Sequence, residues 1–109
     1  MPEQNNIPDY MREGLVRYIL RGTPPGGFMT SLLCNDLMGA FAQADSTNIL
    51  RLADYAAFFW NVAPRSCFGS AENVSAWIIK RNETPLSAGS VRWPSEEWKA
   101  LAKRIGGAA

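Results

Sequence analysis

The stretch from residue 49 to residue 62, ILRLADYAAFFWNV, constrains the fold most, because almost every position in it is apolar. On a helical wheel only Arg51, Asp54 and Asn61 interrupt the apolar surface. One wide apolar face is formed by Ile49, Leu52, Ala53, Ala56, Ala57, Phe59 and Trp60. A helix that is apolar around most of its circumference must be covered by other elements. We therefore expect residues 47 to 62 to be the central helix of a compact all-α bundle of about five short helices.

Periodic apolar residues and capping signals predict four further helices. The expected ranges are 8 to 21, 27 to 44, 71 to 81 and 95 to 105. Gly22 is a natural C-cap for the first of these helices, and the prolines that follow it prevent the helix from continuing. Residues 1 to 7 are expected to be a flexible lead-in and residues 8 to 82 the helical core domain. Residues 83 to 109 are expected to be an extension whose short helix packs on that core.

The size, charge and hydropathy of the chain narrow its possible functions. With 109 residues, 47% hydrophobic and 19% charged, it is typical of a single globular domain. A net charge of +1 argues against nucleic acid as the primary ligand, because nucleic-acid binders more often carry a basic excess that neutralises the phosphates and supplies most of the affinity. The first ten residues contain no secretory signal, and no apolar run reaches the ~20 residues that a membrane span requires. We expect a protein of the bacterial host cytoplasm that does not enter the membrane.

The chain contains no histidine, which removes the commonest general base and the commonest metal ligand. No cofactor, no metal site and no enzymatic activity are therefore predicted. Cys67 precedes a predicted helix, where a thiol can be acidified, but no histidine can serve as its base. We interpret Cys34 and Cys67 as free thiols, with an enzyme that uses Cys67 or the acidic residues as the alternative. The loop from Gly22 to Gly27 is either a tight corner or an anion site at a helix N-terminus.

Two groups of polar residues are candidate binding sites in the predicted core domain. Arg51 and Asp54, one turn apart, are expected to form an ion pair on a strip that is either solvated or a recognition patch. The residues of this strip are Arg51, Asp54, Phe58 and Asn61. A polar pocket at the end of a helix pair would be lined by Asn35, Asp36, Asp45, Asn48 and Asn61. Asparagine side chains both donate and accept hydrogen bonds, which suits the edges of nucleotide bases.

Interleaved basic and aromatic residues in the C-terminal part form a third candidate site. They are Arg92, Trp93, Trp98, Lys99, Lys103 and Arg104. Trp98 belongs to the apolar stripe of its helix, so Trp93 is predicted to be the exposed anchor. Together with Arg65 in the loop after the central helix, the predicted binding residues are Asn35, Asp36, Asp45, Asn48, Arg51, Asp54, Phe58, Asn61, Arg65, Arg92 and Trp93.

Scattered residues between positions 7 and 79 resemble a group of small proteins carried by bacterial phages and prophages. The resemblance rests on Tyr18, Gly22, Pro25-Gly26-Gly27-Phe28, Asn35-Asp36-Leu37, Ala40, Ala44-Asp45, Asn48, Pro64, Cys67-Phe68-Gly69-Ser70 and Trp77. That group has no agreed activity, so the resemblance implies a phage setting and no mechanism. Phage accessory proteins of this size without catalytic residues often resemble anti-defence factors, such as anti-CRISPR proteins.

The leading functional hypothesis is therefore a non-catalytic binding protein, a monomer or homodimer, that occludes a surface of a bacterial defence complex. A few aromatic and arginine anchors would supply its affinity. One alternative is a sponge that binds a small nucleotide in the polar pocket. A further alternative is a protein of the virion or of its assembly.

Overall fold

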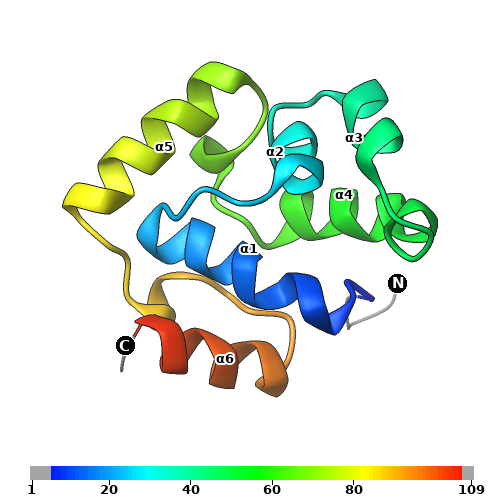
Figure 1. The fold of residues 1–109 in the computed structure, drawn as a ribbon. Coiled ribbons are helices and arrows are strands. Elements are labelled where there is room, and N and C mark those ends of the chain that lie inside the picture. The colour runs from blue at the N-terminus through cyan, green and yellow to red at the C-terminus, as the bar shows by residue number, and fades with distance from the viewer. Residues whose placement is uncertain (1–5, 107–109) are drawn as a thin grey trace.

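The computed structural model describes residues 6 to 106 and consists of α-helices joined by loops and short 3-10 helices (Figure 1). In order, these are α1 (Asp9–Arg21), α2 (Gly27–Leu33), α3 (Leu37–Gln43), η1 (Asn48–Arg51), α4 (Leu52–Asn61), η2 (Arg65–Cys67), α5 (Ala71–Glu83), η3 (Ala88–Ser90) and α6 (Glu96–Gly106). No strand occurs in the described part of the chain, so the predicted all-α class is confirmed.

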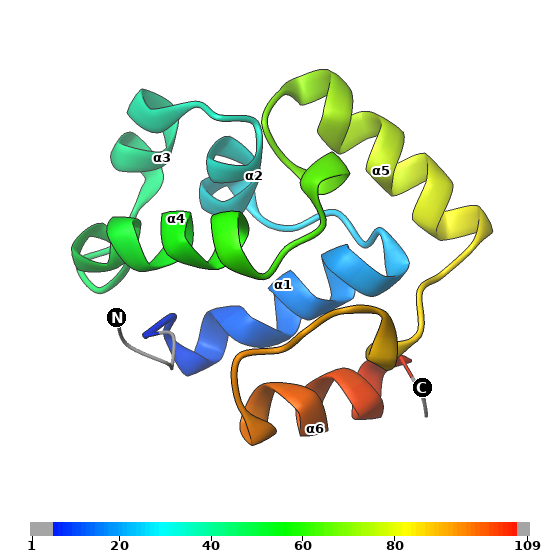
Figure 2. The same cartoon turned by 180° about the vertical axis from the view of Figure 1, so that it is seen from behind.

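The helix at the centre of the molecule is α1, whereas the sequence predicted residues 47 to 62 for that place. Figures 1 and 2 show α1 between α6 on one side and α2, α4 and α5 on the other. The core residues of α1 are Leu15, Val16, Tyr18, Ile19 and Leu20. Gly22 ends the helix in the left-handed conformation with φ 71°, as predicted. A Cβ at Gly22 would lie 2.7 Å from the Ile78 carbonyl oxygen, so this glycine also allows α1 and α5 to approach each other closely.

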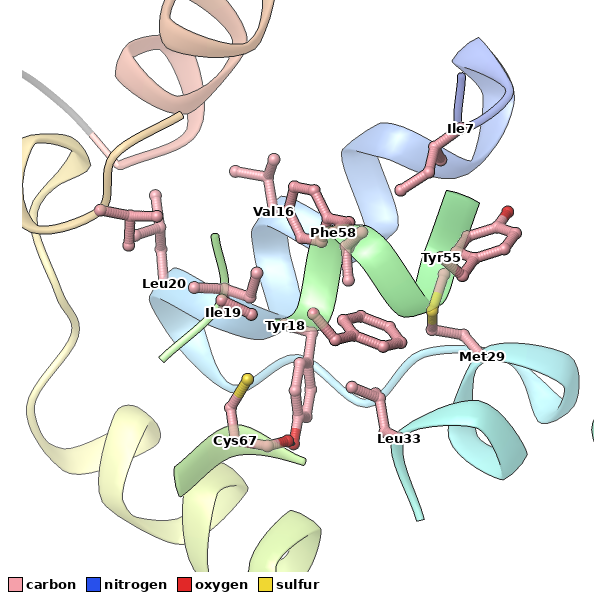
Figure 3. Packing of buried hydrophobic residues seen from close by; sticks show 14 of the residues in the cluster. Ile7, Val16, Tyr18, Ile19, Leu20, Met29, Leu33, Tyr55, Phe58 and Cys67 are labelled. Atoms are coloured by element: carbon pink, nitrogen blue, oxygen red, sulfur yellow. The ribbon is translucent and has the colours of Figure 1, made fainter. Parts of the chain in front are cut away.

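Helix α4 turns a different face to the core from the one that the wheel suggested. Tyr55, Phe58 and Phe59 are buried, whereas Trp60 is 65% exposed. The prediction that Phe58 lies on the polar surface strip is wrong, because Phe58 is fully buried beside α1 (Figure 3). Its ring stacks on that of Trp98, with 4.8 Å between the ring centroids. This aromatic stack joins the buried side of α4 to α6.

The predicted helix from 27 to 44 is broken into α2 and α3. Asn35 has a φ of 64°, in the left-handed region that terminates helices. The Asn35 and Asp36 amides donate to the carbonyls of Leu32 and Ser31, at 3.1 and 2.8 Å, in a Schellman motif. The Asp36 carboxylate then caps α3 by accepting from the Gly39 amide at 2.9 Å. Asn-Asp thus ends one helix and starts the next, so α3 turns back beside α2.

The C-terminal region completes the same core. Trp93 is 6% exposed, so the prediction that it is an exposed anchor is wrong. Its ring is nearly parallel to that of Trp98, with 6.0 Å between centroids, and its indole N–H donates to the Ala88 carbonyl at 2.8 Å. The N–H of a buried tryptophan usually has a hydrogen-bond partner, and the Ala88 carbonyl is that partner here. Arg12 from α1 covers the outer side of Trp98, with 5.2 Å from its guanidinium carbon to the ring centroid.

The beginning of the described chain also belongs to the core. The predicted lead-in falls mainly outside the described residues, but Ile7 is 1% exposed and packs in the hydrophobic cluster (Figure 3). The radius of gyration of the Cα atoms, 13.0 Å, is that of a compact domain of about 100 residues. None of the helices within residues 6 to 106 is long and apolar enough to cross a membrane.

Candidate functional site

An apolar groove opens between the α2–α3 corner and the exposed side of α4. We call it the α3–α4 groove. Its volume is about 370 Å³, within the range of small-ligand and peptide pockets. It is lined by Leu32, Asn35, Asp36, Leu37, Leu52, Ala56, Phe59, Trp60, Phe68 and Gly69. Asn35 and Asp36 are the predicted binding residues that line it.

The aromatic part of the groove is held by contacts between distant parts of the chain. Phe59 and Phe68 stack with 5.7 Å between their centroids. The Gly69 amide donates to the Leu33 carbonyl at 2.7 Å, which joins the loop after η2 to the end of α2. The Asn73 side-chain amide donates to the Phe68 carbonyl at 3.0 Å. The groove is therefore preformed, which lowers the entropy cost of binding.

Helix α3 extends the apolar surface beyond the groove. Ala40 is its only residue that is classed as buried, and its large side chains are directed to solvent. The exposed fractions are 63% for Leu37, 74% for Met38 and 58% for Phe41. Contiguous exposed apolar side chains of this size are typical of a binding surface.

Trp60 lines the groove, and Arg65 lies against the Trp60 ring. The Arg65 guanidinium carbon lies 4.6 Å from the centroid of the Trp60 ring. Arg65 comes from η2, just after α4, so the short loop through Pro64 brings it back over the ring. Tryptophan and arginine are the residues most enriched among binding hot spots. The predicted anchor Arg65 thus lies beside a tryptophan that the sequence analysis had assigned to the core.

The polar residues predicted to share one pocket with Asn35 and Asp36 do not line the groove. Asn48 is 3% exposed and accepts a hydrogen bond from the Tyr55 hydroxyl at 2.7 Å, which gives it a structural role. Asp45 accepts from the Asn48 amide at the start of η1 at 2.6 Å, and it also accepts from the Tyr10 hydroxyl at 2.6 Å. The hydrogen bond from Tyr10 is the main reason that the pKa of Asp45 is lowered. Asn61 is exposed near the end of α4.

The predicted ion pair between Arg51, at the end of η1, and Asp54, in α4, is confirmed, with 3.6 Å between the two side chains. It lies outside the lining of the groove. An exposed pair of this kind contributes at most ~1 kcal/mol to stability. We see no feature there that points to a ligand.

The structure gives the Cys67 thiol no means of activation. Cys67 is fully buried, and this burial raises the pKa of its thiol to about 12. Its carbonyl accepts a hydrogen bond from the Tyr18 hydroxyl at 2.7 Å, and Figure 3 shows these two residues side by side in the core. Cys34 and Cys67 are both free thiols, as interpreted from the sequence. Within residues 6 to 106 no group of three or more cysteine, aspartate or glutamate side chains gathers closely enough to hold a metal ion.

Sequence reasoning missed the apolar residues that form most of this site. The helical period of Met29 and Leu33 continues through Leu37 and Phe41, so an unbroken helix from 27 to 44 would place all four side chains on one apolar face. The signal that could have revealed them is Asn35-Asp36, a left-handed C-cap residue followed by an N-cap residue. Once the helix is broken there, the stripe on α3 is no longer in phase with the stripe on α2.

No protein-family model, no curated protein and no solved structure matches this chain. The functional assignment therefore depends on the geometry of the groove and on the resemblance described above.

Proposed function

We propose that this chain is a non-catalytic binding protein that attaches to a bacterial defence complex through the α3–α4 groove and blocks one of its surfaces. The observation that carries the proposal is a preformed groove lined by the exposed side chains of Leu37 and Trp60, together with the exposure of Met38 and Phe41 on the same helix as Leu37. These side chains are apolar, and their burial in a complex would be favourable by about 25 cal/mol per Å². The setting, a phage or another mobile element, is supported by the sequence resemblance alone.

Partner recognition would be divided between two parts of the groove. In one part, Trp60 with Arg65 against its ring provides a large aromatic anchor and a cation. In the other, Asn35 and Asp36 offer polar groups that can fix the register of the partner. The most suitable partner segment is apolar and carries a hydrogen-bond donor or a basic residue that can reach Asp36.

The proposal is tested by affinity capture with the tagged protein from a bacterial lysate that contains active defence systems. Captured proteins are identified by mass spectrometry, and small molecules released from the purified protein are analysed in parallel. We expect a stoichiometric subunit of a defence complex and, in a reconstituted assay, loss of the activity of that complex.

Matched variants show whether the captured subunit binds at the groove. The double variant Met38→Ser with Trp60→Ala should lose the captured subunit. Ile79→Ser, which alters another exposed apolar residue, on α5, should retain it. Equal capture by both variants would contradict the role of the groove. Capture of no defence subunit, with or without release of a nucleotide, would contradict the whole proposal.

A further inference from the structure

A second depression lies between α6 and the segment that begins at η3, and the α3–α4 groove shares none of its residues. We call it the basic hollow. Its volume is about 410 Å³. It is lined by Ala88, Gly89, Val91, Arg92, Trp93, Lys99 and Lys103. Three of these residues are cationic and none is acidic.

The three cations come from two elements that converge on the hollow. Lys99 and Lys103 are four residues apart on α6 and therefore share one side of that helix. Arg92 belongs to the segment between η3 and α6. Glu96 lies 3.3 Å from Lys99, but it is exposed and forms only a weak pair. Among the described residues no carboxylate forms an ion pair with Arg92 or Lys103.

The positive charge of the chain is concentrated in this part of the sequence. After residue 79 there are six basic residues and three acidic ones, a net charge of +3, whereas residues 1 to 79 carry five basic and seven acidic residues, a net charge of −2. These two values add up to the overall charge of +1. A local excess of cations around a concave surface attracts anions even when the whole molecule is nearly neutral.

The floor of the hollow is apolar and fixed. Ala88, Val91 and Trp93 are buried, and the hydrogen bond from Trp93 to the Ala88 carbonyl joins the two ends of this segment. The stack of Trp93 on Trp98 fixes the floor to α6. Since Trp93 is only 6% exposed, its ring face is not available to stack on a base. A ligand would therefore be held through its charge.

We propose that the basic hollow binds a small polyphosphate anion, such as the diphosphate group of a nucleotide, with little selectivity for the base. Arg92 would contact phosphate oxygens through its planar guanidinium group, and Lys99 and Lys103 would contact them as point charges. The charge of three cations matches that of two adjacent phosphates better than it matches that of a single carboxylate. This inference does not depend on the proposed function of the α3–α4 groove.

The test is a titration of the isotope-labelled protein with pyrophosphate and, separately, with ADP, followed by the backbone amide signals in NMR spectra. We expect saturable shifts at Gly89, Arg92 and Lys103 with similar affinity for both anions. The double variant Arg92→Ala with Lys103→Ala should bind about tenfold more weakly or worse. The control variant Arg51→Ala with Lys80→Ala removes the same charge outside the hollow and should bind like the unmodified protein.

Several outcomes would overturn the proposal. Equal weakening in the two double variants would indicate nonspecific attraction to net charge. Shifts that do not saturate, or that spread over all basic residues, would have the same meaning. Tighter binding of single-stranded DNA or of a glutamate-rich peptide to the same residues would assign the hollow to a macromolecule instead.

Discussion

Helices α3 and α6 are both short and rich in apolar side chains, but they use them in opposite ways. The described core includes Trp98, Ala102 and Ile105 of α6, and their burial against α1 and α4 stabilises the fold. Helix α3 buries Ala40 alone and leaves Leu37, Met38 and Phe41 in solvent. Figures 1 and 2 place α3 at the outer edge of the molecule, far from α6. The apolar residues of α6 are thus explained by folding, whereas the exposed apolar residues of α3 are those that we propose to bind a partner.

The largest expected effect is on the α6 side. Trp98→Ala removes a fully buried ring that stacks on both Phe58 and Trp93, so we expect a loss of ~3–5 kcal/mol in the free energy of unfolding. Urea denaturation followed by circular dichroism measures this loss. Trp60→Ala is the matched control, because the same residue type is exposed there, and it should lose at most ~1 kcal/mol. Similar losses in both variants would contradict the contrast between the buried Trp98 of α6 and the exposed Trp60 of α4.

The next effect concerns the corner that directs α3 away from the core. Asn35→Ala places a residue that is neither glycine nor polar at φ 64°, a conformation that few other residues adopt readily. We therefore expect a loss of about 1 kcal/mol in the free energy of unfolding. Asn35→Gly should leave stability unchanged or raise it slightly, because glycine adopts this conformation freely. Thermal denaturation of the two variants measures this difference in stability. If Asn35→Ala were as stable as Asn35→Gly, the corner would not depend on the backbone conformation of residue 35.

A smaller effect is expected when the exposed residues of α3 are replaced. The double variant Met38→Ser with Phe41→Ser should change the free energy of unfolding by less than ~0.5 kcal/mol per site, because both side chains are already solvated. The same variant should lose partner binding in the affinity capture. A large loss of stability in urea denaturation would show that α3 contributes to the core after all.

The smallest effect concerns the loop between α3 and η1, which is joined to α1 by the Tyr10–Asp45 hydrogen bond. This bond lowers the pKa of Asp45 in the folded state, so its contribution to stability is present above the unfolded pKa of ~3.9 and is lost as the pH falls through the folded value. In Tyr10→Phe, the drop in melting temperature between pH 7 and strongly acidic pH should be slightly smaller than in the unmodified protein. An identical drop in both proteins would show that the bond does not contribute in solution.

The ends of most helices could be predicted from the sequence, because capping is a local interaction. Gly22 terminates α1, and Ser70 caps α5 by accepting from the Asn73 amide at 3.0 Å. The inward side of α6 was also predictable, since Trp98, Ala102 and Ile105 recur with a clear helical period. Of the predicted binding residues, Asn35 and Asp36 line the α3–α4 groove, Arg65 lies against the Trp60 ring, and Arg92 and Trp93 line the basic hollow.

Only the tertiary structure decided which apolar side chains are buried. Helix α4 carries large rings on opposite sides, so its sequence period cannot distinguish Phe58 from Trp60 as the core residue. The choice depends on partners far along the chain, namely Phe28 against Tyr55 and Trp98 against Phe58. Burial also depends on the break in the helix at Asn35. Because of this break, Leu37 and Phe41 no longer lie on the same side as the apolar residues of α2. Local sequence determined where the helices begin and end, and long-range packing determined which of their faces remain free to bind.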